Sequence, residues 1–168
     1  MYKHIAFDPS EKNFGYAVIL CESCNKDAET MFNRTIVTYG TIKPVEKTLI
    51  SRLSHISIEL KELRNRYIDF KTPTFVWIEE QAFWDSKKGF NAAAKQDIIK
   101  SAASSGLPIP IFMDVAKITL VSPIKWRGQV PEKTLKNRIA NKYAISLKGL
   151  DSHSIDALGL ALYGASQV

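Results

Sequence analysis

The sequence predicts an α/β protein with a mixed β-sheet, folded as one domain over residues 1–168. Three short runs rich in β-formers come first, and later strand-like runs alternate with helical patterns, an order typical of α/β layouts. The chain is long enough for one sizeable core, and 45% hydrophobic residues is ordinary for a globular protein. No repeat, low-complexity segment or linker divides the sequence.

The first part of the chain is expected to form three antiparallel strands. Residues 3–8 and 13–20 are apolar runs separated by Pro9-Ser10-Glu11-Lys12, whose turn-forming residues indicate a hairpin. After a polar stretch, residues 35–40 could return as the third strand.

Cys21 and Cys24 form a lone Cys-x-x-Cys motif. We interpret them as two thiols in a hairpin loop, because zinc would need two further ligands that no nearby His or Cys supplies. A half zinc site shared across a dimer and a redox pair are the alternatives.

A helical pattern follows the strands. From Thr48 to about Phe70, apolar residues recur at alternating spacings of four and three, the stripe of an amphipathic helix. Residues 75–79 are nearly all apolar before an acid, which is typical of a central strand covered on both faces. Residues 91–105 predict an alanine-rich helix whose small side chains would let another helix pack closely.

The remaining elements alternate between strand and helix. Pro108 and Pro110 interrupt the helical pattern, and residues 111–116 fit either a strand or a short helix. Asp151 or Ser152 can cap the last helix, which carries apolar residues into the core. The other expected elements are a strand at 117–121 and a helix that begins at Pro131 and runs to about Tyr143.

Four acid or imidazole side chains on three segments are candidates for one site. Asp8 and Glu79 each end a strand-like run, and His153 and Asp156 lie three positions apart on the last helix. Alone, Asp8 fits an Asx-turn residue, and His153 fits a helix-terminal histidine bonded to Ser152 or water. Because a buried carboxylate must be paired, hydrogen-bonded or metal-bound, the four together indicate a divalent-metal site.

Glu79 is followed directly by Glu80. Alternation along a strand sends their side chains to opposite faces, so only one can enter a shared site. Glu79 is preferred, because it ends the apolar run that must be buried.

The charge balance and the first residues of the sequence indicate the kind of partner and the cellular location to expect. Lys plus Arg number 23 against 17 Asp plus Glu, a formal charge of +6 that fits a polyanionic partner and equally an ordinary soluble surface. No signal-peptide stretch opens the sequence, and no run approaches the ~20 apolar residues of a membrane span. We therefore expect a cytoplasmic protein without membrane contact.

Three motifs resemble those of the RuvC-type Holliday junction resolvases of the RNase H-like superfamily, in particular their phage-encoded relatives. The motifs are Phe7-Asp8-Pro9-Ser10-x-x-x-x-Gly15-Tyr16-Ala17, Trp77-Ile78-Glu79-Glu80-Gln81 and His153-Ser154-Ile155-Asp156-Ala157-Leu158-Gly159-Leu160-Ala161. The segment from Val121 to Lys133 also looks like a motif of the phage branch. The resemblance implies an RNase H-like fold, with a five-stranded mixed sheet whose first three strands are antiparallel, flanked by helices.

The resemblance further implies a metal-dependent endodeoxyribonuclease that resolves Holliday junctions or branched DNA. Asp8, Glu79, His153 and Asp156 carry over as its catalytic residues, holding two Mg²⁺ ions, or Mn²⁺, about 4 Å apart. The ions would activate a water molecule and stabilise the leaving 3′-oxygen. His153, which is Asp in some relatives, is either a ligand or the base that orients the water.

Aromatic and cationic side chains near this site are expected to bind the DNA. Phe83 and Trp84 suit stacking on bases at a branch point, and Phe83 would take the family's wedging position if Glu80 were the ligand. Trp126 fits either a core anchor or a DNA contact. The cations expected to contact phosphates are Lys87, Lys88, Lys125, Arg127 and, as the best single candidate, Lys133.

A junction has two strands to cut symmetrically, so a homodimer is expected, with the helix at 91–105 as its interface. Three other functions remain open: a related nuclease that cuts flaps or RNA/DNA hybrids, an actin-like ATPase, and a non-catalytic DNA-binding module. The ATPase would need a glycine where Ser10 stands and a longer chain, and a binding module would not need four converging acid and imidazole groups.

Overall fold

The computed structural model describes residues 1–22, 33–80 and 92–168. The strands are β1 (Tyr2–Asp8), β2 (Phe14–Cys21), β3 (Arg34–Ile42), β4 (Thr74–Glu79) and β5 (Lys117–Val121). The helices are α1 (Leu49–Tyr67), α2 (Ala92–Gly106), α3 (Pro108–Phe112), α4 (Pro123–Trp126), α5 (Glu132–Tyr143) and α6 (Ser152–Gly164).

The strands form one five-stranded sheet in the order β3-β2-β1-β4-β5. The pairs β1–β2 and β2–β3 are antiparallel, whereas β1–β4 and β4–β5 are parallel. This topology confirms the predicted mixed sheet, in which the first three strands are antiparallel and helices flank both faces.

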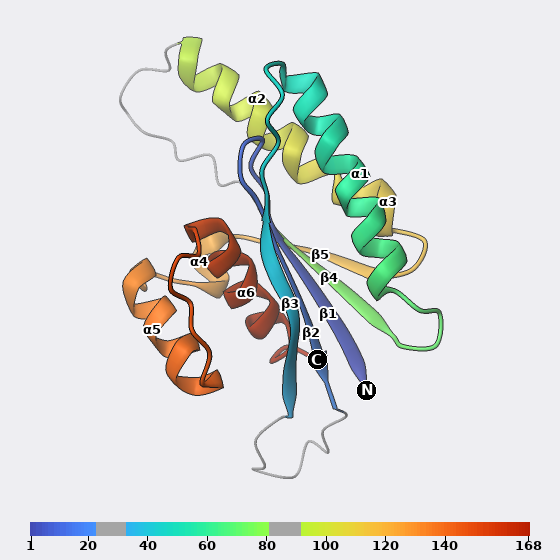
Figure 1. The fold of residues 1–168 in the computed structure, drawn as a ribbon, viewed down its shortest axis with the longest axis vertical. Helices are drawn as coiled ribbons and strands as arrows, with labels where there is room; N and C mark the ends of the chain where they lie inside the picture. The colour runs from blue at the N-terminus through green and yellow to red at the C-terminus, as the bar shows by residue number, and fades with distance from the viewer. Residues whose placement is uncertain (23–32, 81–91) are drawn as a thin grey trace.

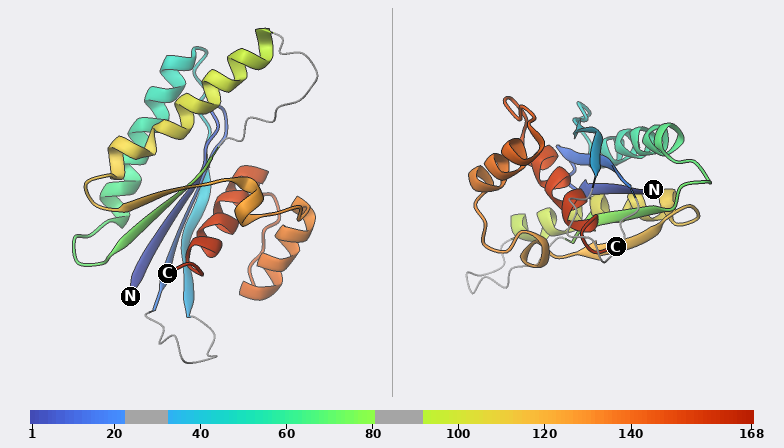
Figure 2. Two further views of the ribbon diagram at one scale, coloured as in Figure 1. Left: turned by 180° about the vertical axis from the view of Figure 1, so that it is seen from behind. Right: turned by 90° about the horizontal axis from the view of Figure 1, so that it is seen from below.

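Helices cover the two faces of the sheet as separate layers (Figures 1 and 2). The layer of α1, α2 and α3 lies on one face, and the layer of α4, α5 and α6 lies on the other. Neighbouring residues of β1 alternate between the two layers. Ile5 and Phe7 belong to the core shared with α1 and α3, whereas Ala6 belongs to the core shared with α6.

Helix α6 packs directly against the sheet. Its residues from Ser154 to Leu162 are buried. A Cβ atom at Gly164 would overlap the indole ring of Trp77 in β4, so the glycine allows the end of the helix to approach that strand. This close packing makes α6 a fixed support for the side chains at its first turn.

The structure corrects several predicted boundaries. The first long helix is capped by Thr48, whose hydroxyl accepts the Ser51 backbone N–H at 3.2 Å, but it ends at Tyr67 rather than near Phe70. Pro108 and Pro110 both lie inside α3, because the N–H groups of a first helical turn need no intrahelical partner. The short helix α4 was not predicted from the sequence.

Cys21 is the last residue of β2 and is 4% exposed within the core beneath α6. The prediction that places it in a hairpin loop is therefore wrong, because the strand continues through this small, apolar side chain. Cys24 lies outside the described residues. No helix in the described ranges has the length and apolar character needed to cross a bilayer.

Candidate active site

Two of the predicted acids end neighbouring strands at the same edge of the sheet. Strands β1 and β4 are parallel, and Phe7 pairs with Ile78. Asp8 and Glu79 are the next residues and the last ones of their strands, so they occupy corresponding positions on the two strands. Alternation places both side chains on the face covered by α6, together with Ala6 and Trp77. Asp8 is buried, with only 5% of its surface exposed.

The first turn of α6 is fixed to the end of β3 by its cap. Asp151 Oδ1 accepts the Ser154 backbone N–H at 3.0 Å and the Thr41 hydroxyl at 2.6 Å. Lys43 lies 3.0 Å from Asp151 Oδ2. Burial acts to raise the pKa of Asp151, but these hydrogen bonds and the Lys43 charge outweigh it and lower the pKa to about 2. The cap is therefore ionised at neutral pH, and it fixes the position of the first turn, which contains His153.

Gly15 allows this helix to begin beside Asp8. It pairs with Asp8 across β1 and β2, and a Cβ atom at this position would overlap the backbone carbonyl of His153. A larger residue would push the first turn of α6 away from the sheet. The Gly-Tyr-Ala segment of the first motif thus contributes the space into which the last motif fits.

Replacing Gly15 with Ala is expected to destabilise the protein by about 1–3 kcal/mol, because the added methyl group overlaps backbone that cannot rotate away. Urea unfolding monitored by circular dichroism measures the change. Gly106→Ala is the matched control, since nothing lies within 4 Å of a Cβ atom at that position. Equal stability of the two variants would contradict the close approach of α6 to β2.

His153 and Asp8 are in direct contact. The His153 Nδ1 atom lies 2.7 Å from Asp8 Oδ2. This hydrogen bond raises the pKa of His153, with the negative charge of Asp8 adding to the effect, although burial acts in the opposite direction. The structure thus joins an acid from the first strand to an imidazole from the last helix, 145 positions apart in sequence.

Glu79 and Asp156 each receive an N–H group from α4 or its cap. The Trp126 indole Nε1 donates to Glu79 Oε2 at 2.8 Å, and the Arg127 Nη1 donates to Asp156 Oδ2 at 2.8 Å. Burial raises the pKa of Glu79 to about 7, and the charge of Asp8 adds to the rise. Burial likewise raises the pKa of Asp156 to about 6, although Arg127 opposes it.

These acids fit divalent cations chemically. Burial and the negative charge of Asp8 raise the pKa values of Glu79 and Asp156, so a cation bound beside them would favour their ionised forms. The Asp156 Oδ1 atom is buried and has no hydrogen-bond partner among the described residues. In those same residues, no group of three or more His, Cys, Asp or Glu side chains is arranged so that it could hold a metal ion. Carboxylate oxygens are the ligands that Mg²⁺ prefers.

The protonation of these groups predicts how stability depends on pH once metal ions are removed with EDTA. Glu79 and His153 have raised pKa values in the folded protein, so the folded state holds protons that unfolding releases. Their stabilising contribution is complete below the ordinary values of 4.5 and 6.5 and is lost as the pH rises through the raised values. His4, whose pKa burial lowers to about 4, opposes the trend only below its ordinary value of 6.5.

The midpoint of urea unfolding in EDTA is therefore expected to fall as the pH rises above 6.5, the ordinary value for His153, and through about 7, the raised pKa of Glu79. Added Mg²⁺ should reduce this fall, because a cation would stabilise the ionised carboxylates. A midpoint that rises over the same interval would contradict the raised pKa values.

The structure distinguishes the two adjacent glutamates. Glu79 is partly buried and faces Asp8, whereas Glu80 is exposed, and its backbone N–H donates to Val121 O at 2.9 Å. Glu79 is therefore the glutamate that joins the other acids in space, as the apolar run predicts.

The expected DNA-binding residues have different positions. Lys125 and Lys133 are exposed on α4 and α5. Arg127, expected to contact phosphate, instead has its guanidinium on Asp156, and its Nε atom donates to Val130 O at 3.0 Å. Trp126 packs against the core beneath α6 and also contacts an acid. Phe83, Trp84, Lys87 and Lys88 lie outside the described residues.

The sequence analysis did not predict that Trp126 and Arg127 are hydrogen-bond partners of Glu79 and Asp156. The signal was present, because the segment from Val121 to Lys133 already resembles a family motif. Without α4, however, nothing in the sequence places these two residues against Glu79 and Asp156.

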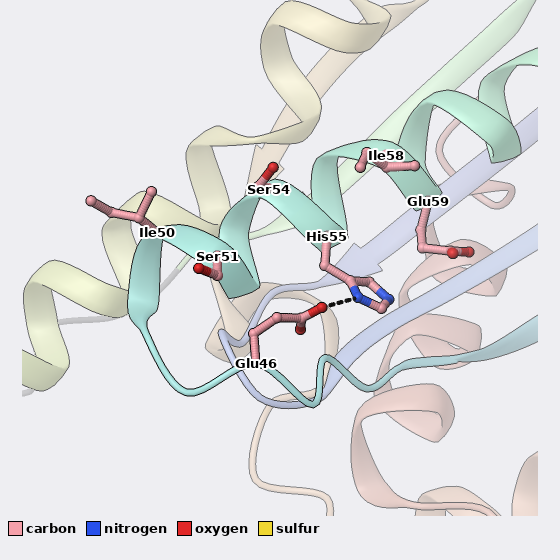
Figure 3. Close-up of a pocket in the computed structure, with 7 residues that line it drawn as sticks. All are labelled: Glu46, Ile50, Ser51, Ser54, His55, Ile58 and Glu59. Atoms are coloured by element: carbon pink, nitrogen blue, oxygen red, sulfur yellow. Dashed lines mark hydrogen bonds and ion pairs between the residues drawn. The ribbon is translucent and has the colours of Figure 1, made fainter.

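A shallow groove of about 500 Å³ lies elsewhere, along α1. Ser51, Ser54 and the pair of Glu46 and His55 contribute to its lining, and Figure 3 shows the last two pointing toward each other. His55 Nδ1 lies 2.8 Å from Glu46 Oε1. Because α1 covers the opposite face of the sheet from α6, this groove is separate from the four converging side chains.

Comparisons with known proteins agree on the architecture. No protein-family model matches the sequence, and no curated protein matches it. Among solved structures, Thermus thermophilus RuvC is 17% identical, with a TM-score of 0.71 over 97% of this chain and 93% of that one. T. thermophilus RuvC in complex with Holliday junction substrate is 15% identical, with a TM-score of 0.73 over 97% and 92%.

The yeast mitochondrial Holliday junction resolvase Ydc2 is 13% identical, with a TM-score of 0.62 over 98% of this chain and 79% of that one. At such low identity these similarities concern the path of the backbone. Together with the strand order, they show that this chain has the RNase H-like fold of RuvC.

Proposed function

We propose that this protein is a metal-dependent endonuclease that resolves Holliday junctions or other branched DNA, of the phage-like branch of the RuvC-type resolvases. The observation that carries the proposal is the meeting of Asp8, Glu79, His153 and Asp156 on one face of the sheet. The fold shared with RuvC, including RuvC in complex with a Holliday junction, supports the same substrate class.

Carboxylate oxygens of Asp8, Glu79 and Asp156 would hold the cations, Mg²⁺ or Mn²⁺, with His153 as a further ligand or as a base. When bound, a pair of such cations activates a water molecule toward the scissile phosphate and stabilises the leaving 3′-oxygen. Asp8 orients the imidazole of His153, whose ring nitrogens can accept or give up a proton. Arg127 balances the charge of Asp156.

The DNA would lie across the edge of the sheet where these side chains meet. Exposed Lys125 and Lys133 supply phosphate contacts in this proposal, and the segment containing Phe83, Trp84, Lys87 and Lys88 supplies stacking and further cations. A homodimer assembled through α2 would present two active sites, one for each strand cut at a junction.

The proposed function is tested by cleavage of a mobile four-way junction with Mg²⁺, with Mn²⁺ and with EDTA. Flaps, linear duplex and an RNA/DNA hybrid are assayed at matched concentration. Symmetric nicking of the junction with either cation, blocked by EDTA, is the expected result. Equal rates on every substrate would reject junction selectivity, and faster cleavage of flaps or of the hybrid would favour the related nuclease activities.

A further inference from the structure

We propose that Trp126 is a positioning residue that holds Glu79 ready for metal binding. The inference rests on the proposed function, because it assigns a supporting residue to one of its metal ligands. The indole N–H donates to Glu79 Oε2 at 2.8 Å, and this hydrogen bond fixes the orientation of the carboxylate that would bind a cation.

The indole ring is held in place by its surroundings. Trp126 ends α4, which follows β5, and β5 pairs with β4, the strand that carries Glu79. A Cβ atom at Gly159 of α6 would come within 2.8 Å of Trp126 Cζ3 and 3.3 Å of Leu135 Cδ2. The ring thus occupies space that only glycine leaves free, and it packs against the core beneath α6. The N–H group cannot turn away without displacing these neighbours.

An indole suits this role better than a charged donor would. Its N–H can only donate, so its one possible partner here is a carboxylate oxygen of Glu79. It carries no positive charge, so it does not repel a cation that binds the same carboxylate. Arg127, on Asp156, provides the contrast, because its guanidinium brings a full charge to the acid that it holds. Such supporting hydrogen bonds typically change metal affinity by about 10–100-fold when they are removed.

Trp126→Phe tests the role, because it keeps an aromatic ring beside Gly159 and removes the N–H donor. Titration calorimetry with Mn²⁺ alone, without DNA, is expected to show affinity weakened by about 10–100-fold. Trp77→Phe is the matched control: Trp77 lies on the same strand as Glu79, and its indole N–H donates to His4 Nδ1 at 3.1 Å. The control variant should bind Mn²⁺ as the wild type does.

A double-mutant comparison separates positioning from general loosening of the core. In a Glu79→Gln background, adding Trp126→Phe should weaken Mn²⁺ binding no further, because the ligand that Trp126 holds is already lost. Wild-type Mn²⁺ affinity in the Trp126→Phe single variant, or an equal further loss in the Glu79→Gln background, would overturn the inference.

The unmutated indole provides a second measurement that does not depend on how well a Trp126 variant folds. In proton–nitrogen NMR spectra, the Trp126 indole signal should shift on adding Mg²⁺ and should shift in metal-free Glu79→Gln. The Trp77 indole signal should stay in place. A Trp126 signal that shifts neither on adding Mg²⁺ nor in Glu79→Gln would overturn the inference.

The same measurements distinguish an error in the proposed metal site from an error in the role assigned to Trp126. If the wild type binds no Mn²⁺ while the Trp126 signal still shifts in Glu79→Gln, the metal site itself is wrong, and the metal-binding part of this inference falls with it. If the wild type binds Mn²⁺ and Trp126→Phe binds it equally well, only the role of Trp126 is rejected.

Discussion

Asp8→Asn is expected to abolish junction cleavage, with a loss on the order of 10³-fold or more, as when a charged member of a catalytic group is removed. Asp8 contacts His153 directly, and its charge raises the pKa values of both Glu79 and Asp156. The neutral Asn side chain keeps the size of Asp but lacks the negative charge with which Asp8 would hold a cation.

Junction binding should survive this change, or become tighter, because the variant removes one negative charge that repels the phosphates. Gel-shift titration in EDTA measures binding, and product formation with Mg²⁺ measures cleavage. Asp114→Asn is the charge-matched control: Asp114 is exposed and pairs with Arg64 of α1, on the far side of the sheet. Unchanged cleavage by Asp8→Asn would reject the proposed site.

The Glu79→Gln and Glu80→Gln variants should differ widely in their rates of junction cleavage, although the two residues are adjacent. Glu79 faces Asp8 and is held by Trp126, so its loss as a metal ligand should reduce cleavage by about 10²-fold or more. Glu80 is exposed and points to the opposite face, so its substitution should leave the rate close to that of the wild type.

Cleavage rates at saturating Mg²⁺ and at a series of lower concentrations measure both effects. A Glu79→Gln defect that high Mg²⁺ partly rescues would indicate lost metal affinity. A larger loss for Glu80→Gln than for Glu79→Gln would mean that the other register is correct, with Glu80 as the ligand and Phe83 in the wedging position.

Much of the fold could be predicted because its signals are local. The strand that ends at Glu79 is an uninterrupted apolar run, and the helix capped by Thr48 repeats its apolar residues at helical spacing. The preference for Glu79 over Glu80 comes from the apolar run that Glu79 ends, a signal that requires no knowledge of other segments. The secondary structure of the segment around Pro108 and Pro110 was harder to predict, because proline is compatible with the first turn of a helix as well as with its end.

For the site, too, the identity of the residues could be predicted from the sequence, whereas their contacts could not. Local patterns were enough to identify the candidate side chains: Asp8 and Glu79 at strand ends, and His153 and Asp156 on one helix. The contacts that each of them makes became visible in the folded protein alone. The Asp8–His153 pair spans 145 positions, and the Trp126–Glu79 hydrogen bond spans 47. Such contacts depend on strand order and on glycines that admit a helix or a ring, and sequence spacing carries no direct record of either.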